Sequence, residues 1–150
     1  IDVDLSNYIV VYAYSERIYK IEAEAIQAFA HSKGKKTLSI GVKQSFTDLY
    51  VNVDPFTLLA YIKNADYVIT DTFHGTVFSK KYQIPFATLI RPSNIEKLSD
   101  LLEKFGLSSR TVNDASNIKD VCTEEIDKLN ILKLLKTYRE SAITYLKDNL

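Results

Sequence analysis

Two patterns of apolar residues alternate along the chain. In one, apolar, β-branched and aromatic residues follow one another without interruption, which is typical of strands buried on both faces of a parallel sheet. In the other, apolar residues recur every three or four positions, which predicts amphipathic helices. The uninterrupted runs predict strands over residues 8–14, 36–42, 67–70 and 86–90, with shorter strands at 49–53 and 110–112. The periodic segments predict helices that begin near residues 15, 54, 73, 93 and 123.

Residues with strong capping preferences mark the ends of these helices. Ser15 and Asp54 are expected N-caps, and Pro55 follows at a first helical position, where its missing N–H costs nothing. Ser93 and Glu96 have the spacing of a capping box. The helices are expected to end at Gly34, near Gln83 before Pro85, and at Gly106. The helix that starts at Asp54 is expected to bury Phe56, Leu58, Leu59 and Ile62.

Strands that alternate with helices predict an α/β fold. Because parallel strands need long crossover connections, we expect a three-layer α/β/α Rossmann-like domain with a mostly parallel sheet. Residues 1–150 are expected to form one such domain, with a long helical tail from about Thr123 to Leu150. The tail carries an apolar stripe that should cover another surface, formed by Leu132, Leu135, Tyr138, Ile143 and Leu146.

Composition narrows the class of protein. Lys plus Arg and Asp plus Glu both number 19, a neutral balance that argues against a general binder of nucleic acid or anionic membranes. Cys122 is the single cysteine, so no internal disulfide can form. No apolar run approaches the roughly 20 residues of a membrane-spanning helix and no signal peptide opens the chain, which predicts a cytoplasmic location. The chain begins with Ile1 and contains no methionine, so we expect it to be a fragment of a longer protein.

Candidate chemistry gathers in residues 66–79, a strand that turns directly into a helix. The amino end of a helix offers N–H groups without intrahelical partners and a partial positive charge, which suit a phosphate or carboxylate. His74 can give or take a proton near neutral pH, Thr72 and Thr76 add hydroxyls, and Gly75 would let a ligand approach the backbone. The same residues also have structural interpretations, with Thr72 as an N-cap and Gly75 allowing close packing. The other histidine, His31, is expected at a solvated helix end.

Other reaction classes find little support in the sequence. It has no Gly-x-Gly-x-x-Gly, no P-loop and no Gly-x-Ser-x-Gly pattern. Two histidines and one cysteine, widely spaced, form no recognisable zinc site, so no metal is expected.

Three segments of the chain resemble the polysaccharide pyruvyl transferase family. Residues 65–79, read Ala-Asp-Tyr-Val-Ile-Thr-Asp-Thr-Phe-His-Gly-Thr-Val-Phe-Ser and followed by Pro85-Phe86, are similar to the family's central motif. Residues 54–62 resemble the helix that leads into the motif, and residues 101–110, which contain Leu-Leu-x-x-Phe-Gly-Leu-x-x-Arg, resemble the stretch that follows it. The resemblance extends over about residues 8–112. Thr72 replaces the family's usual Ser and keeps the hydroxyl, whereas Asn94 and Ile95 stand where an Arg is frequent.

The resemblance implies an architecture and a reaction. The family is similar to GT-B glycosyltransferases, so this chain would be the C-terminal Rossmann-like domain of a two-domain enzyme. Members with an assigned activity transfer the enolpyruvyl carbons of phosphoenolpyruvate to two sugar hydroxyls as a ketal. Phosphoenolpyruvate would be the donor substrate, a saccharide the acceptor, and no cofactor is expected. The missing N-terminal domain would supply the acceptor side, so the isolated domain is expected to lack turnover.

The resemblance also assigns roles to residues of the central motif. His74 would be a proton-transfer group, and the N–H groups and hydroxyls of Thr72, Phe73, Gly75 and Thr76 would hold the donor phosphate. Arg110, or in second place Arg91, would help to neutralise the phosphate, although either arginine could instead form a surface salt bridge. Two alternatives remain open: the nucleotide-sugar domain of a GT-B glycosyltransferase, and a non-catalytic binding domain on the same fold.

Overall fold

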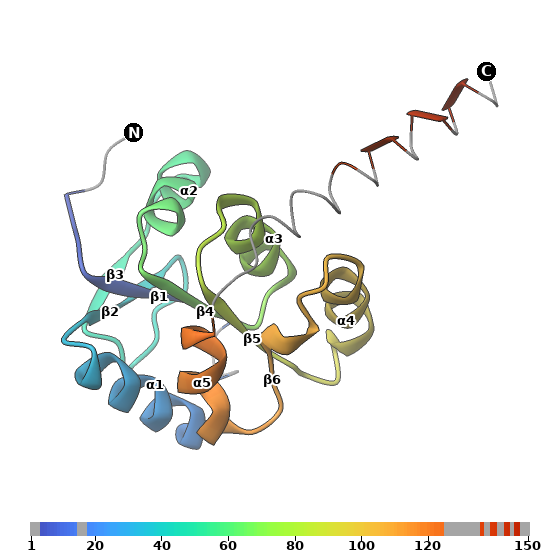
Figure 1. The fold of residues 1–150 in the computed structure, drawn as a ribbon. Coiled ribbons are helices and arrows are strands. Elements are labelled where there is room, and N and C mark those ends of the chain that lie inside the picture. Colours follow the sequence, from blue (N-terminus) through green and yellow to red (C-terminus); the bar gives the residue numbers. More distant parts are fainter. Residues whose placement is uncertain are drawn as a thin grey trace.

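Six parallel strands form the centre of the protein in the computed structural model, which describes residues 4–14, 18–124, 136, 139–140, 143–144 and 146–147 (Figure 1). The strands are β1 (Tyr8–Tyr12), β2 (Lys36–Ile40), β3 (Leu49–Val51), β4 (Tyr67–Thr70), β5 (Phe86–Leu89) and β6 (Thr111–Val112). Their order across the sheet is β3-β2-β1-β4-β5-β6, and each neighbouring pair is parallel. The prediction of a mostly parallel sheet is confirmed.

Helices cover both faces of the sheet. They are α1 (Lys20–Ser32), α2 (Pro55–Lys63), α3 (Phe73–Tyr82), α4 (Ile95–Lys104) and α5 (Ile118–Thr123), with short 3-10 turns η1 (Ser108–Arg110) and η2 (Ala115–Asn117). Side chains of α1 and α5 pack in one core cluster, and those of α2, α3 and α4 pack in the other. In Figure 1 α1 and α5 lie below the sheet and α2 and α3 above it. The arrangement is the three-layer α/β/α fold that the sequence predicts.

The central strand β1 shows why the apolar runs are continuous. Tyr8, Ile9, Val10 and Val11 are all fully buried. Ile9 and Val11 pack against the α1 and α5 layer, while Tyr8 and Val10 pack against the α2 and α4 layer. Because successive strand side chains point to opposite faces, a strand covered on both faces needs apolar residues at every position.

Several predicted helix ends are confirmed. The Asp54 carboxylate accepts hydrogen bonds from the amide and hydroxyl of Thr57, at 3.0 and 2.7 Å, and these lower its pKa below the ordinary value. Gly34 and Gly106 have positive φ just beyond α1 and α4, a conformation that favours glycine. Gln83 ends α3 in the left-handed conformation.

Other predicted boundaries are wrong. The first helix begins at Lys20, where the amide of Tyr19 donates to the Glu22 carboxylate, and Ser15 lies outside the described residues. Helix α4 begins at Ile95, so Asn94 rather than Ser93 holds the N-cap position. The predicted helix start at Thr123 is instead the end of α5. Glu22 and Asn94 also bond to distant segments, Glu22 to the Arg91 guanidinium and Asn94 to the Asp71 carbonyl.

Two predictions of burial also need correction. Phe56 is 74% exposed at the start of α2, although Ile62 of the same helix is fully buried. In the predicted tail, Leu132, Leu135 and Tyr138 lie outside the described residues. Ile143 and Leu146 are described, helical and exposed. The described tail positions therefore do not show the burial that an apolar stripe predicts.

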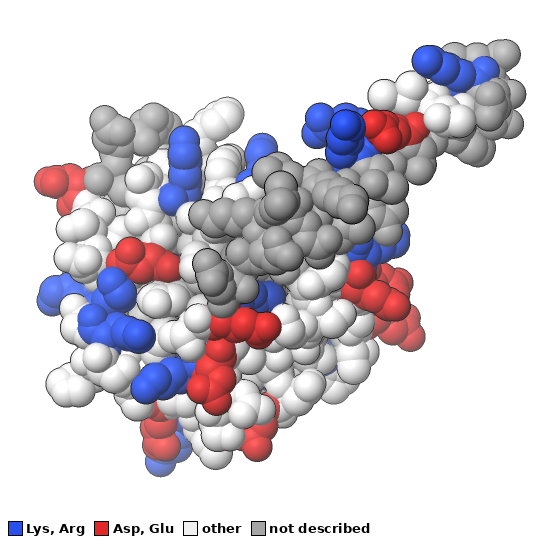
Figure 2. Space-filling view, viewed as in Figure 1, with Lys and Arg blue, Asp and Glu red and all other residues white. Residues whose placement is uncertain are grey.

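The surface reflects the balanced charge of the sequence. Figure 2 shows Lys and Arg interspersed with Asp and Glu over the described part of the visible face, with uncharged residues between them. Within the described residues, no helix is both long enough and apolar enough to cross a membrane.

Candidate functional site

The strand order reverses between β1 and β4, and the candidate site lies there. The chain leaves β1 toward α1 on one face of the sheet and leaves β4 toward α3 on the other. Loops that diverge in this way leave a crevice at the carboxyl ends of the strands, where open α/β sheets bind ligands. A pocket of about 210 Å³ occupies this position and is lined by Tyr12, Ala13, Tyr14, Val42, Thr72, Phe73, His74 and Lys97.

A group of threonines fixes the turn from β4 into α3. The Thr70 hydroxyl donates to the carbonyl of Tyr12 at 2.6 Å, which ties the end of β4 to the end of β1. Thr72 is the N-cap of α3, and its hydroxyl oxygen accepts from the Gly75 amide at 2.8 Å. Thr72 lines the pocket, but its hydroxyl is also 2.9 Å from that of Thr70. The N-cap interpretation is confirmed.

Gly75 is required by packing between α3 and β4. A Cβ atom at this position would lie 2.3 Å from Oγ1 of Thr70 and 2.8 Å from Oγ1 of Thr72, closer than real Cβ contacts. Gly75 is buried and is not among the residues that line the pocket. The structural interpretation of this glycine therefore accounts for it.

Thr76 also lies inside the protein. It is fully buried, and its hydroxyl contacts the Thr72 carbonyl at 2.9 Å and the Thr88 hydroxyl at 3.1 Å. These contacts join α3 to β5, and the structure does not bring the Thr76 hydroxyl into the pocket.

His74 is exposed at the pocket, one residue after Phe73 in the first turn of α3. Its ring lies 6.0 Å from that of Phe73 and 6.1 Å from that of Phe78, measured between centroids. Because Phe73 and His74 are the first two residues of the helix, their amides have no intrahelical acceptor. The pocket thus combines an exposed imidazole with the positive end of a helix dipole.

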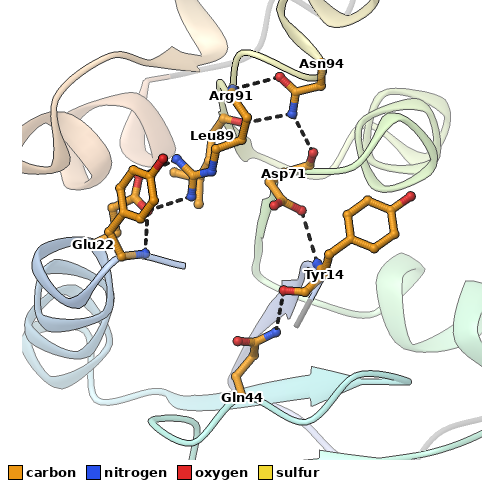
Figure 3. Close-up of polar contacts among 8 residues, drawn as sticks. Tyr14, Glu22, Gln44, Asp71, Leu89, Arg91 and Asn94 are labelled. Atoms are coloured by element: carbon orange, nitrogen blue, oxygen red, sulfur yellow. Dashed lines mark hydrogen bonds and ion pairs between the residues drawn. The ribbon is translucent and has the colours of Figure 1, made fainter. Parts of the chain in front are cut away.

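A chain of hydrogen bonds supports the loops around the pocket (Figure 3). The Gln44 amide donates to the carbonyls of Ala13 and Tyr14, and the backbone amide of Tyr14 donates to the Asp71 carboxylate at 3.3 Å. The Asn94 side chain donates to the Asp71 carbonyl and accepts from the Arg91 amide, both at 2.8 Å. These bonds connect the segments that follow β2, β1, β4 and β5.

Arg91 extends this chain to α1. Its guanidinium forms two hydrogen bonds with the Glu22 carboxylate, at 2.9 and 2.6 Å, and both side chains are buried. The guanidinium also lies 4.3 Å from the ring centroid of Tyr19. Burial by itself would lower the pKa of Arg91, but Glu22, Tyr19 and Asp71 together raise it above the ordinary value. Arg91 is therefore held as a charged structural group.

Arg110 lies away from the pocket. It is 1% exposed, and its guanidinium donates to the carbonyls of Val121 and Glu124 at the end of α5. It also lies 5.8 Å from the ring of Phe86, at the start of β5. Burial lowers its pKa from the ordinary value. Of the predicted phosphate-neutralising arginines, the structure brings neither into the pocket lining.

The sequence interpretation missed Lys97 and the supporting role of Gln44 and Asn94. Lys97 is exposed on α4, and its ammonium lies 4.6 Å from the ring centroid of Phe73. No local pattern marks it, because it is one of several charged residues on the solvent face of an amphipathic helix. Among the described residues, no group of three or more His, Cys, Asp or Glu side chains is placed to hold a metal ion.

Comparisons with known proteins identify a family and a similar fold. The model of a family described as polysaccharide pyruvyl transferase matches residues 2–94. The fold is similar to the crystal structure of the glycosyltransferase SnogD from Streptomyces nogalater, with a TM-score of 0.53 and 13% identity. That match covers 92% of this chain and 38% of SnogD, so the chain spans less than half the length of that structure. A search of curated proteins gives no match. Because the family model covers more than half of the chain, the chain belongs to the polysaccharide pyruvyl transferase family.

Proposed function

We propose that this domain binds phosphoenolpyruvate in the pocket beside α3 and takes part in its transfer to a saccharide. The observation that carries the proposal is His74, exposed next to the free amides at the start of α3, in a chain of this family. The pocket has a volume of about 210 Å³, and the helix amides at its edge suit a small anionic donor.

The proposed reaction forms two C–O bonds at C2 of the enolpyruvyl group. Two sugar hydroxyl oxygens attack C2, the bond from C2 to the phosphate oxygen breaks, and the methylene carbon gains one proton to become a methyl group. One hydroxyl proton balances that gain, and the other leaves with inorganic phosphate. In this proposal His74 moves one of these protons, and the amides of Phe73 and His74 hold the anionic donor; the exposure of His74 at the pocket supports the first role.

We further propose that the acceptor groups come from a second, N-terminal domain of the same protein. Among the residues that line the described pocket, His74 is the one imidazole. A reaction that both protonates carbon and deprotonates hydroxyls calls for at least one more proton-transfer group.

Substitution of His74 by Ala in the full-length protein tests the proposal. The rate of ketal formation, followed by the new methyl signal in proton NMR and by phosphate release, is expected to fall by about 100-fold or more. The affinity for phosphoenolpyruvate should change much less, because the backbone amides remain.

His31→Ala is the matched control, since His31 is exposed at the end of α1 and does not line the pocket. It should retain wild-type activity, and residues 1–150 alone should release no phosphate. Unchanged activity of the His74→Ala protein would contradict the proposed role and favour a non-catalytic binding domain.

A further inference from the structure

We propose that Lys97 supplies the cationic contact for the phosphate or carboxylate of the small anion bound in the pocket. The inference rests on the proposed donor site and identifies a group that the sequence motif does not contain. Lys97 is the one Lys or Arg among the eight residues that line the pocket, and it stands on the same rim as Thr72, Phe73 and His74.

The arginines near the sheet are already engaged in other contacts. The Arg91 guanidinium is bonded to the Glu22 carboxylate (Figure 3). Arg110 is turned toward the end of α5. A donor with both phosphate and carboxylate charge therefore meets no spare arginine within the described network, whereas the Lys97 ammonium is exposed at the opening.

The contact that Lys97 makes with Phe73 can be replaced by a contact with an anion. Its ammonium rests on the face of Phe73, 4.6 Å from the ring centroid. An exposed cation–π contact is weak, whereas a hydrogen bond between an ammonium and an anionic oxygen is among the stronger polar contacts in proteins. The Phe73 ring thus holds the Lys97 ammonium beside the start of α3 until a bound anion replaces the ring as the partner of Lys97.

Asn94 positions Lys97 for this role. Asn94 precedes α4, and its side chain joins the Asp71 carbonyl to the Arg91 amide. Asp71 in turn comes directly before Thr72, the N-cap of α3. The first turn of α4, which carries Lys97, is therefore anchored to the same loop that carries His74.

Calorimetric titration of the 150-residue chain tests the inference. Wild type, Lys97→Met and Lys97→Arg are titrated with phosphoenolpyruvate, inorganic phosphate and pyruvate. Lys97→Met should weaken phosphoenolpyruvate binding about tenfold, and Lys97→Arg should stay within about threefold of wild type, because a charge-assisted hydrogen bond is lost in one and kept in the other. Whichever of phosphate and pyruvate shows the larger loss identifies the group that Lys97 contacts.

Lys104→Met is the matched control, an exposed lysine in the last turn of the same helix, and it should bind as wild type does. Lys97→Gln repeats the test if the Met variant does not melt like wild type. Saturable binding by wild type that Lys97→Met and Lys97→Gln retain within twofold would overturn the role of Lys97 and leave the donor site standing. Absence of phosphoenolpyruvate binding by wild type would overturn both.

Discussion

His74 and Gly75 are adjacent in the sequence but face opposite environments. His74 is exposed at the pocket, whereas Gly75 is buried against the hydroxyls of Thr70 and Thr72. Successive residues of an α-helix point about 100° apart, so one turn presents one residue to a ligand and the next to the sheet. The motif therefore combines a chemical residue with a packing residue, and the two should respond differently to substitution.

Gly75→Ala is expected to destabilise the protein by about 1–3 kcal/mol, as is typical of overpacked positions. The added methyl group would displace Thr70, whose hydroxyl is already bonded to Tyr12 and to the amide of Thr72. That cost exceeds the roughly 1 kcal/mol that Ala gains over Gly in a helix. Urea unfolding measures the change, with the exposed Lys81→Ala as control in the same helix. Equal stability of the two variants would refute the packing role.

At the scale of elements, a buried ion pair connects α1 to the end of β5. Glu22 accepts from the Tyr19 amide at the start of α1 and from the Arg91 guanidinium, 69 residues away. The same loop after β5 carries Asn94, which contacts the loop before α3. The amino ends of α1, α3 and α4 are thus held together by polar contacts at the edge of the sheet where the pocket lies.

Glu22→Gln is expected to lower the free energy of unfolding by about 3–5 kcal/mol, because it leaves the buried Arg91 charge without its carboxylate. Glu24→Gln, on the exposed side of the same helix, should have little effect. The double variant Glu22→Met/Arg91→Met should be more stable than Glu22→Gln, since the buried pair is then removed as a whole rather than broken. Denaturant titration of the three proteins checks this order, and a Glu22→Gln protein as stable as Glu24→Gln would contradict it.

At the scale of the whole molecule, the core contains ionisable groups that folding keeps neutral. Burial raises the pKa of Tyr8, with smaller effects from Tyr61 and Asp66, and burial followed by Tyr14 raises that of Tyr12. Burial also raises the pKa of Cys122 to about 12, against a smaller opposing effect of Arg110. Each group holds its proton more tightly in the folded state than in the unfolded state.

Stability should therefore fall as the pH rises above about 9. Groups whose folded pKa is raised contribute stability fully below their unfolded pKa, which is 9.0 for the thiol and 10.0 for the tyrosines, and lose it as the pH rises toward the folded value. Urea unfolding at pH 8 and pH 10.5 measures the loss. The free energy of unfolding should fall less over this range in Tyr8→Phe than in wild type. Tyr50→Phe, at an exposed position, should lose as much as wild type does. An equal loss in Tyr8→Phe and wild type would contradict the assignment.

Local features of the sequence predicted much of the fold and the turn that carries His74 of the candidate site. Apolar runs identified the buried strands, and the cap at Asp54 and the one at Thr72 follow from hydrogen bonds within three residues. His74 could be placed at the start of a helix because the strand before it and the cap at Thr72 are both marked by residues close to it in the sequence. The exposed Phe56 was missed because an apolar residue does not by itself tell which face of a short helix is covered.

The sequence alone thus determined the succession of strands and helices along the chain, the turn into α3 and the position of His74 in that turn. These features depend on residues that are close together in the chain. Only the tertiary structure decided which distant side chains meet. It paired Glu22 with Arg91, turned Arg110 toward α5 and set Lys97 of α4 over Phe73 of α3. Such contacts depend on how helices pack across a common sheet, and no short stretch of sequence contains that information.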